Sequence, residues 1–140
     1  GVIEGAHWLA THRERPAVGG PLWGLDQFPR LTQGAEGVLF ITPAPMPRDA
    51  ISGDEFAIRY RKISDGVEPA WLAVLAYDAA QTLIAAIAAS PISATPATVS
   101  SSLAQISLDG LSGHISFNAE GNWNNAHISV YKWKHAEIVN

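Results

Sequence analysis

Residues 70–89 form a nearly unbroken apolar run, AWLAVLAYDAAQTLIAAIAA, and this run limits the possible folds more than any other feature of the chain. Glu68-Pro69 precede it, and proline is favourable in the first turn of a helix, where its missing N–H has no helical partner, so we expect a helix from residue 69. The helix is apolar nearly all round, which requires packing on several sides. Asp78 and Gln81 interrupt its middle and disfavour a membrane span. We therefore expect a buried helix.

The composition is that of an apolar chain with few charges. Of the 140 residues, 47% are hydrophobic and 16% are charged, against roughly 25% charged in ordinary soluble domains. This balance suggests that something outside the chain covers part of its surface. The formal charge is −4 and the basic residues are scattered, which excludes a basic patch for nucleic acid. The absence of cysteine excludes disulfides, thiolate metal sites and a cysteine nucleophile.

Helical and strand-like segments alternate along the chain. Besides the apolar run, helical character is found at 3–13, 24–33, 53–64 and 98–106, and strand character at 15–20, 37–42, 114–118 and 126–139, the last interrupted near His135-Ala136. Continuous apolar strands are expected in a sheet that is covered on both faces. The order of the elements predicts an α/β fold with a largely parallel sheet and helices on both faces.

Two short segments mark where elements join. TPAPMPRDA at 42–50 carries three prolines in its first six residues, so it is expected to be an extended connector at a domain boundary. Ser52 and Glu55 then have the spacing of a capping box, in which each side chain bonds the backbone N–H of the other at the start of a helix. In GLSGHISFNAEGNW at 110–123, alternation followed by Asn118 and Gly121 predicts a strand that runs into a tight turn.

Taken together, these pieces resemble a known family. The succession EGV at 36–38, EP and AYDA at 68–69 and 76–79, and GLSGHISFNAEGN resembles the C-terminal part of a type I periplasmic binding protein, most closely the branched-chain amino acid receptors of ABC importers. That family carries Gly-x-x-Gly, Ile/Leu-x-Phe-Asp and Gly-Asp near its end. The matching residues here are Gly110, Gly113, Ile115, Phe117, Asn118, Gly121 and Asn122.

The resemblance implies an α/β clamshell of two lobes, joined by hinge strands, that closes on a small ligand. It implies that residues 1–46 belong to lobe two, 47–117 to the C-terminal part of lobe one, and 118–140 to the return into lobe two. The family's first half is missing from this chain. We therefore expect a partner that covers the exposed apolar surfaces, either the missing N-terminal half or a second copy of the chain.

The residues that this resemblance places at the ligand are Pro21, Leu22, Trp23, Trp71 and Leu72. In the family's amino-acid binders, a carboxylate near the first of these pairs with the ligand's ammonium group, whereas this chain has no acid at 20–22. Trp23 is a candidate for stacking on a less polar or aromatic ligand. The alternatives are that Trp23 packs against the helix of Phe28 and that Trp71 belongs to the core.

No pattern predicts catalysis, metal binding or a cofactor. The five histidines show neither H-E-x-x-H nor i, i+4 pairing, and Ser112 in GLSGH is one residue short of a G-x-S-x-G elbow. The glycines at 19–20 and 34–37 lack the rest of a dinucleotide fingerprint. Asp78 is expected to be structural, with hydrogen-bond partners where it is buried. We expect a binding protein and not an enzyme.

The resemblance implies amino-acid transport: a periplasmic or extracellular solute-binding receptor, with or without a membrane anchor, that delivers an amino acid or related small molecule to an ABC permease in the membrane. The alternative is the ligand-sensing domain of a signalling or regulatory receptor with the same clamshell. Both readings require a small-molecule ligand and no nucleic acid.

Overall fold

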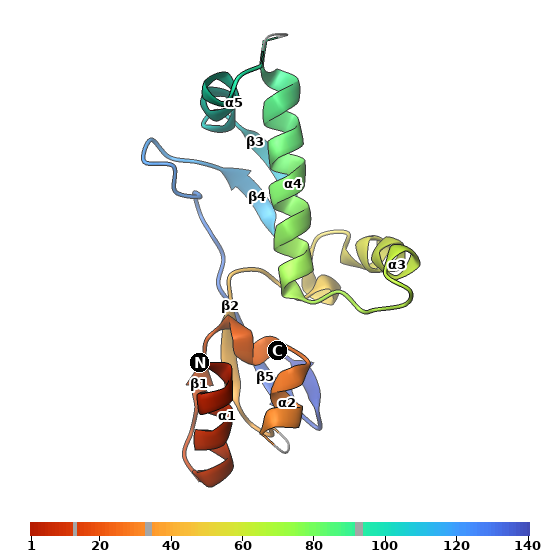
Figure 1. Cartoon of the computed structure of the whole chain (residues 1–140), viewed down its shortest axis with the longest axis vertical. Coiled ribbons are helices and arrows are strands. Elements are labelled where there is room, and N and C mark those ends of the chain that lie inside the picture. The colour runs from red at the N-terminus through yellow and green to blue at the C-terminus, as the bar shows by residue number, and fades with distance from the viewer. Residues whose placement is uncertain (13, 33–34, 92–93) are drawn as a thin grey trace. The chain divides into compact units, whose positions relative to one another are not determined.

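The computed structural model describes residues 1–12, 14–32, 35–91 and 94–140, and it is a mixed α/β structure (Figure 1). Arg13, Gln33 and Gly34, which end or begin expected segments, lie outside the described residues. The chain divides into two compact units. Unit 1 comprises Gly1–Pro43 and Ile128–Asn140, and unit 2 comprises Ala44–His127. The chain therefore passes from unit 1 to unit 2 and back again.

Unit 1 is built on a four-stranded sheet in the order β1-β2-β5-β6. The strands are β1 (Val18–Gly19), β2 (Leu39–Thr42), β5 (Ser129–Lys134) and β6 (Glu137–Val139), and the helices are α1 (Val2–Thr11), the 3-10 helix η1 (Pro21–Gly24) and α2 (Gln27–Leu31). Phe40 of β2 is fully buried and its ring packs beside Tyr131 and Trp133 of β5. Phe28 of α2 is also fully buried. These aromatic side chains form the core of unit 1.

The other face of this sheet carries apolar side chains that no described residue buries. The register places Leu39 beside Val18 and Ile41 beside Val130, and all four side chains are exposed. Strands that are apolar on both faces are typical of a sheet covered on both sides. Unit 1 therefore presents a face suited to a second covering layer.

The strand pairing differs from the largely parallel sheet that the sequence predicts. Among the strands that the structure describes, only β1–β2 is a parallel pair, while β2–β5, β5–β6 and β3–β4 are antiparallel. For β3–β4 and β5–β6 the physical reason is connection length, because a two-residue turn joins strands only in antiparallel fashion. His135-Ala136 is such a turn between β5 and β6, and both residues have positive φ, at 51° and 62°.

Unit 2 contains a long helix, two shorter helices and a hairpin. Its elements are the 3-10 helix η2 (Pro47–Asp49), α3 (Gly53–Ile63), α4 (Trp71–Ala89), α5 (Pro96–Leu103), β3 (Ser107–Gly110) and β4 (Gly113–Ser116). Helix α4 packs against α5 and β3. The core is formed by Ala44, Val74 and Leu111, with Phe56 packed against it.

Helix α4 buries one stripe of side chains and leaves the rest exposed. The buried residues recur every three or four positions: Trp71, Val74, Asp78, Thr82 and Ala86. Leu83, Ile84 and Ile87 are large, apolar and exposed. By length and composition alone, α4 is the one helix of the described residues that is long and apolar enough to cross a membrane. The packing on several sides that the sequence predicts is not supplied by the described part of this chain.

Two helices begin differently from what the sequence predicts. The prediction of a capping box at Ser52 and Glu55 is wrong, because Ser52 adopts left-handed backbone with φ of 53° and its side chain makes no cap hydrogen bond. Glu55 instead pairs with Arg59, at 2.5 Å between Oε1 and Nη2. Helix α4 begins at Trp71, with Ala70 as its N-cap, so Pro69 lies just before the helix and not in its first turn.

A capping box is found instead at α5. Thr95 Oγ1 accepts a hydrogen bond from Thr98 N at 3.3 Å, and Thr95 N donates to Thr98 Oγ1 at 2.8 Å. A threonine therefore takes the place of the usual Glu or Gln at the third position. Pro96 occupies the first turn of this helix.

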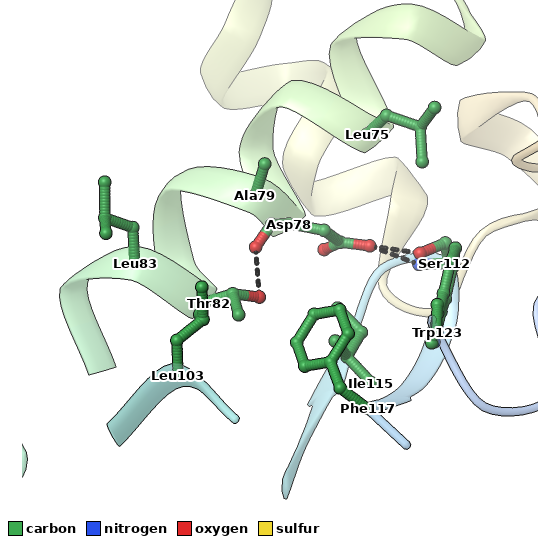
Figure 2. Close-up of a pocket in the computed structure, with 10 residues that line it drawn as sticks. All are labelled: Leu75, Asp78, Ala79, Thr82, Leu83, Leu103, Ser112, Ile115, Phe117 and Trp123. Atoms are coloured by element: carbon green, nitrogen blue, oxygen red, sulfur yellow. Dashed lines mark hydrogen bonds between the residues drawn. The ribbon is translucent and has the colours of Figure 1, made fainter. Parts of the chain in front are cut away.

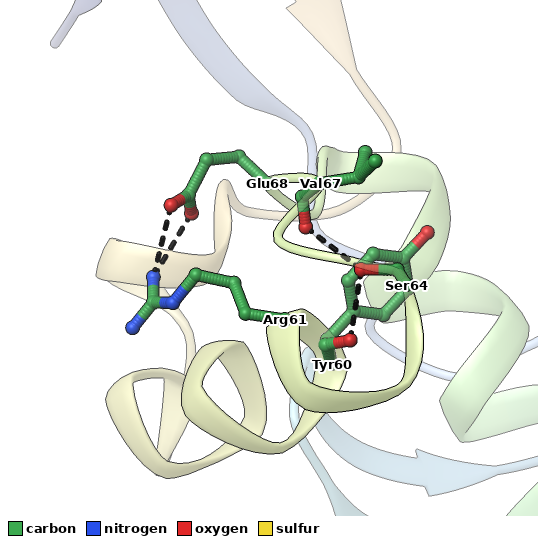
Figure 3. A network of polar contacts seen from close by, with 5 residues as sticks. All are labelled: Tyr60, Arg61, Ser64, Val67 and Glu68. Atoms are coloured by element: carbon green, nitrogen blue, oxygen red, sulfur yellow. Dashed lines mark hydrogen bonds and ion pairs between the residues drawn. The ribbon is translucent and has the colours of Figure 1, made fainter.

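The loop between α3 and α4 is closed by polar contacts (Figure 3). Ser64 Oγ lies within hydrogen-bond distance of the Tyr60 and Val67 carbonyl oxygens, at 2.9 Å and 3.0 Å. Arg61 Nη1 donates to both carboxylate oxygens of Glu68, at 3.1 Å and 3.0 Å. These contacts bring the end of α3 next to the segment that leads into α4.

Candidate functional site

Trp23 lies on η1, directly after β1, and is packed within unit 1. Its ring stacks on Phe28 with centroids 4.8 Å apart. The ring also lies so close to Gly19 that a Cβ there would be 2.0 Å from it. Trp23 therefore packs against helix α2, which is the alternative to ligand contact considered from the sequence. Contact between Trp23 and a ligand remains a prediction.

Pro21 and Leu22 lie beside Trp23 on the same short helix. Pro21 is half-buried and Leu22 is exposed. The Trp23 carbonyl oxygen accepts a hydrogen bond from Trp133 Nε1 at 2.8 Å, which ties η1 to strand β5. This short helix is therefore held in place while the Leu22 side chain remains available at the surface of unit 1.

Trp71 and Leu72 begin α4 in unit 2. Trp71 is only 6% exposed, whereas Leu72 is exposed. Among the described residues, Trp71 Nε1 is the one buried side-chain nitrogen or oxygen without a hydrogen-bond partner. Buried indole N–H groups usually find a partner. The unsatisfied N–H is a donor that a ligand or another part of the protein could use.

The five residues predicted at the ligand thus divide between the two units. Pro21, Leu22 and Trp23 come together on η1, and Trp71 and Leu72 are neighbours at the start of α4. Their joint role in a cleft remains a prediction.

A pocket of about 270 Å³ lies within unit 2, where sequence reasoning placed no site (Figure 2). Its lining comes from α4, α5, β4 and the segments around them: Leu75, Asp78, Ala79, Thr82, Leu83, Leu103, Ser112, Ile115, Phe117 and Trp123. Most of these side chains are apolar. Two segments that carry the family resemblance, AYDA at 76–79 and GLSGHISF at 110–117, contribute to this lining.

Asp78 is the polar centre of this region, and it is fully engaged. Its carboxylate accepts a hydrogen bond from Leu111 N at 2.7 Å. It also accepts hydrogen bonds from Ser112 N at 2.8 Å and from Ser112 Oγ (Figure 2). The backbone at Gly110 approaches so closely that a Cβ would lie 2.7 Å from the carboxylate. The structural role predicted for Asp78 is confirmed, because the carboxylate holds the β3–β4 turn against α4.

The described residues contain no group of three or more His, Cys, Asp or Glu side chains that could hold a metal ion. The polar atoms of the pocket are also occupied, since Thr82 Oγ1 donates to the Asp78 carbonyl oxygen at 2.7 Å. The chemistry that this pocket can perform is the binding of apolar groups.

The chain matches no protein-family model, and no curated protein matches its sequence. Solved structures do match. The leucine-binding protein LivK from Thermotoga maritima has a TM-score of 0.85 at 23% identity, over 99% of this chain and 41% of its own. LivJ from Streptococcus pneumoniae, in complex with isoleucine, has a TM-score of 0.81 at 21% identity, over 98% of this chain and 40% of its own.

This chain has part of the type I periplasmic-binding-protein fold. A third structure with this fold, a solute-binding protein from R. palustris in complex with benzoate, matches all of the chain with a TM-score of 0.77 at 18% identity. The chain spans about two fifths of the length of these binding proteins. These structural neighbours are binding proteins and not enzymes.

Proposed function

We propose that this chain is part of a solute-binding receptor of an ABC importer, which holds an amino acid or related small molecule between two lobes. The observation that carries the proposal is the similarity over nearly the whole chain to substrate-binding proteins. The two crossings of the chain between its units support it, because hinged lobes need such connections. The receptor would act in the periplasm or outside the cell and deliver its ligand to a membrane permease.

In this proposal, residues 1–46 and 118–140 belong to lobe two and residues 47–117 to lobe one. The compact units divide at slightly different points, after Pro43 and after His127. The segment 118–127 therefore packs with unit 2, partly through the bridge between Phe117 and Trp123. We place the two hinge crossings at residues 43–44 and 127–128.

The proposed ligand is apolar or aromatic over most of its surface and carries a hydrogen-bond acceptor. Support comes from the absence of an acid at 20–22, which leaves no partner there for an ammonium group. The unsatisfied Trp71 N–H supports an acceptor such as a carboxylate. Pro21, Leu22, Trp23 and Leu72 supply apolar surface.

The proposed partner that completes the fold is the missing N-terminal half. The exposed apolar residues of α4 in unit 2 and of the open sheet face in unit 1 support this assignment. Support also comes from the matched structures, which are more than twice as long as this chain. A second copy of the chain is the competing occupant, and the mass of the purified protein separates the two.

The test is a thermal-shift screen of the protein as it is naturally produced, against leucine, isoleucine, benzoate and related small acids. A ligand at one hundred times its Kd stabilises the folded state by about 2.7 kcal/mol. Trp71→Phe keeps an aromatic side chain but removes the pyrrole ring with its N–H, so it should weaken binding of an acidic ligand about tenfold. Trp8→Phe, on the exposed side of α1, is the matched control.

Unchanged affinity in Trp71→Phe would remove this N–H from the ligand site. A screen in which no solute raises the unfolding temperature would contradict the transport role. Ligand binding followed by a change in an attached signalling domain would favour the sensory receptor.

A further inference from the structure

The hairpin of β3 and β4 has one polar face. Asp109 lies opposite His114, and Ser107 lies opposite Ser116. Side chains alternate between faces along a strand, so these four share one face, while Ile115 is buried on the other. Because the buried face already anchors the hairpin to its unit, the polar face is the one suited to solvent.

Three side chains on this face form a hydrogen-bonded relay. His114 Nδ1 lies 2.9 Å from Asp109 Oδ1, and His114 Nε2 lies 3.3 Å from Ser107 Oγ. A carboxylate only accepts hydrogen bonds, so in the neutral form of the ring Nδ1 carries the hydrogen and donates a hydrogen bond to Asp109 Oδ1. Nε2 is then left with the lone pair that accepts from the Ser107 hydroxyl. This order of groups is that of an activated serine, a histidine base and an orienting carboxylate.

The relay is held in place and is accessible. The His114 carbonyl oxygen accepts from Trp123 Nε1 at 3.0 Å, and the Asp78 carboxylate fixes the turn at Leu111 and Ser112. The His114 side chain is 56% exposed. A reagent in solution therefore reaches Ser107 without any opening of the fold.

We propose that Ser107 is an acyl-acceptor site for small activated esters. Ser107 Oγ attacks the acyl carbon while its proton passes to His114 Nε2. The bond from the acyl carbon to the leaving oxygen then breaks, and His114 returns the proton to that oxygen. The products are an acylated Ser107 and the free alcohol.

The oxyanion that forms on the acyl oxygen meets solvent at this exposed surface instead of fixed donors, which are usually the largest contribution to rapid acyl transfer. Both the formation and the hydrolysis of the acyl-serine are therefore slow. This site lies outside the residues proposed for solute binding, and it adds a modification site to a binding protein.

The experiment treats the protein, as it is naturally produced, with p-nitrophenyl acetate and locates the acetyl group by peptide mass spectrometry. Acetylation of Ser107 is the expected result, and Ser107→Ala should abolish it. His114→Phe should slow it by about a hundredfold, and Asp109→Asn by at least about tenfold, in line with the contribution of a general base. Ser101→Ala is the control, because Ser101 is exposed and its hydroxyl bonds only its own helix, at Ala97 O.

Thermal unfolding of each variant checks that the hairpin remains folded, so a slower reaction cannot be attributed to lost structure. Acetylation at other residues without Ser107, or a Ser107 rate that neither Asp109→Asn nor His114→Phe changes, would overturn the proposal. Ser107→Ala should leave solute binding unchanged, which separates this site from the proposed transport function.

Discussion

At the scale of single residues, Asp78 has the clearest structural role. A buried carboxylate accepts two backbone N–H groups and one hydroxyl, so a change to an amide turns one acceptor into a donor that faces another donor. We expect Asp78→Asn to lower the free energy of unfolding by about 1–3 kcal/mol. Urea denaturation measures this loss. Asp54→Asn, on the exposed side of α3, should change stability little, and an equal effect of both variants would contradict the assigned role.

A second prediction at this scale concerns the turn at His135-Ala136. Both residues have left-handed backbone, which costs an L-residue roughly 1–2 kcal/mol but costs glycine nothing. Ala136→Gly should therefore raise the free energy of unfolding by about 0.5–1 kcal/mol. Ala80→Gly, inside helix α4, should lower it by about 1 kcal/mol. In thermal unfolding, Ala136→Gly should raise the melting temperature and Ala80→Gly should lower it. These opposite shifts distinguish relief of strain in the turn from a general effect of glycine.

At the scale of elements, the structure moves the capping box from α3 to α5. Thr95→Ala should cost about 1 kcal/mol, because it removes the acceptor of the Thr98 N–H. Ser52→Ala should have little effect, since the Ser52 side chain caps nothing. The denaturant concentrations at which the two variants are half unfolded show whether the capping box lies at α5 or at α3. A large loss in Ser52→Ala alone would restore the sequence-based assignment.

Much of the element order follows from the sequence, and the differences have local causes. Pro69, Pro96 and the proline-rich connector mark element ends because proline restricts the backbone wherever it stands. The Ser52 cap failed because Ser52 has left-handed backbone, whereas a capping residue is usually extended. The close approach of Gly53 to Pro47 beside it is also invisible in the sequence. The antiparallel pairing of β2 with β5 joins residues far apart in the chain, which local periodicity does not report.

In the candidate site, too, some features could be predicted from the sequence and others could not. The structural role of Asp78 was predictable because a carboxylate in an apolar helix needs hydrogen-bond partners. The tight packing of Trp23 against Gly5 and Gly19 could not be predicted, because it depends on how α1 and β1 come together. The relay of Ser107, Asp109 and His114 was also missed, since it exists only once the hairpin register is known.

At the scale of the whole molecule, the exposed side of α4 carries the main prediction. If the missing half covers this side in the protein as naturally produced, Ile84→Glu buries a charge and should lower the free energy of unfolding by more than about 2 kcal/mol. Ile63→Glu, at the far end of α3 and 85% exposed, is the control with a small expected effect. Calorimetry of both variants provides the measurement, and a harmless Ile84→Glu would show that this side of α4 faces solvent.

The two units differ in how their sequence is distributed, and this difference sets an order for their assembly during synthesis. Unit 2 is one continuous segment, Ala44–His127, whereas the sheet of unit 1 pairs Phe40 with Tyr131. On the ribosome, unit 2 can condense as soon as its residues emerge. Strand β2 must wait for its antiparallel partner until β5 (Ser129–Lys134), which follows the whole of unit 2, has been translated.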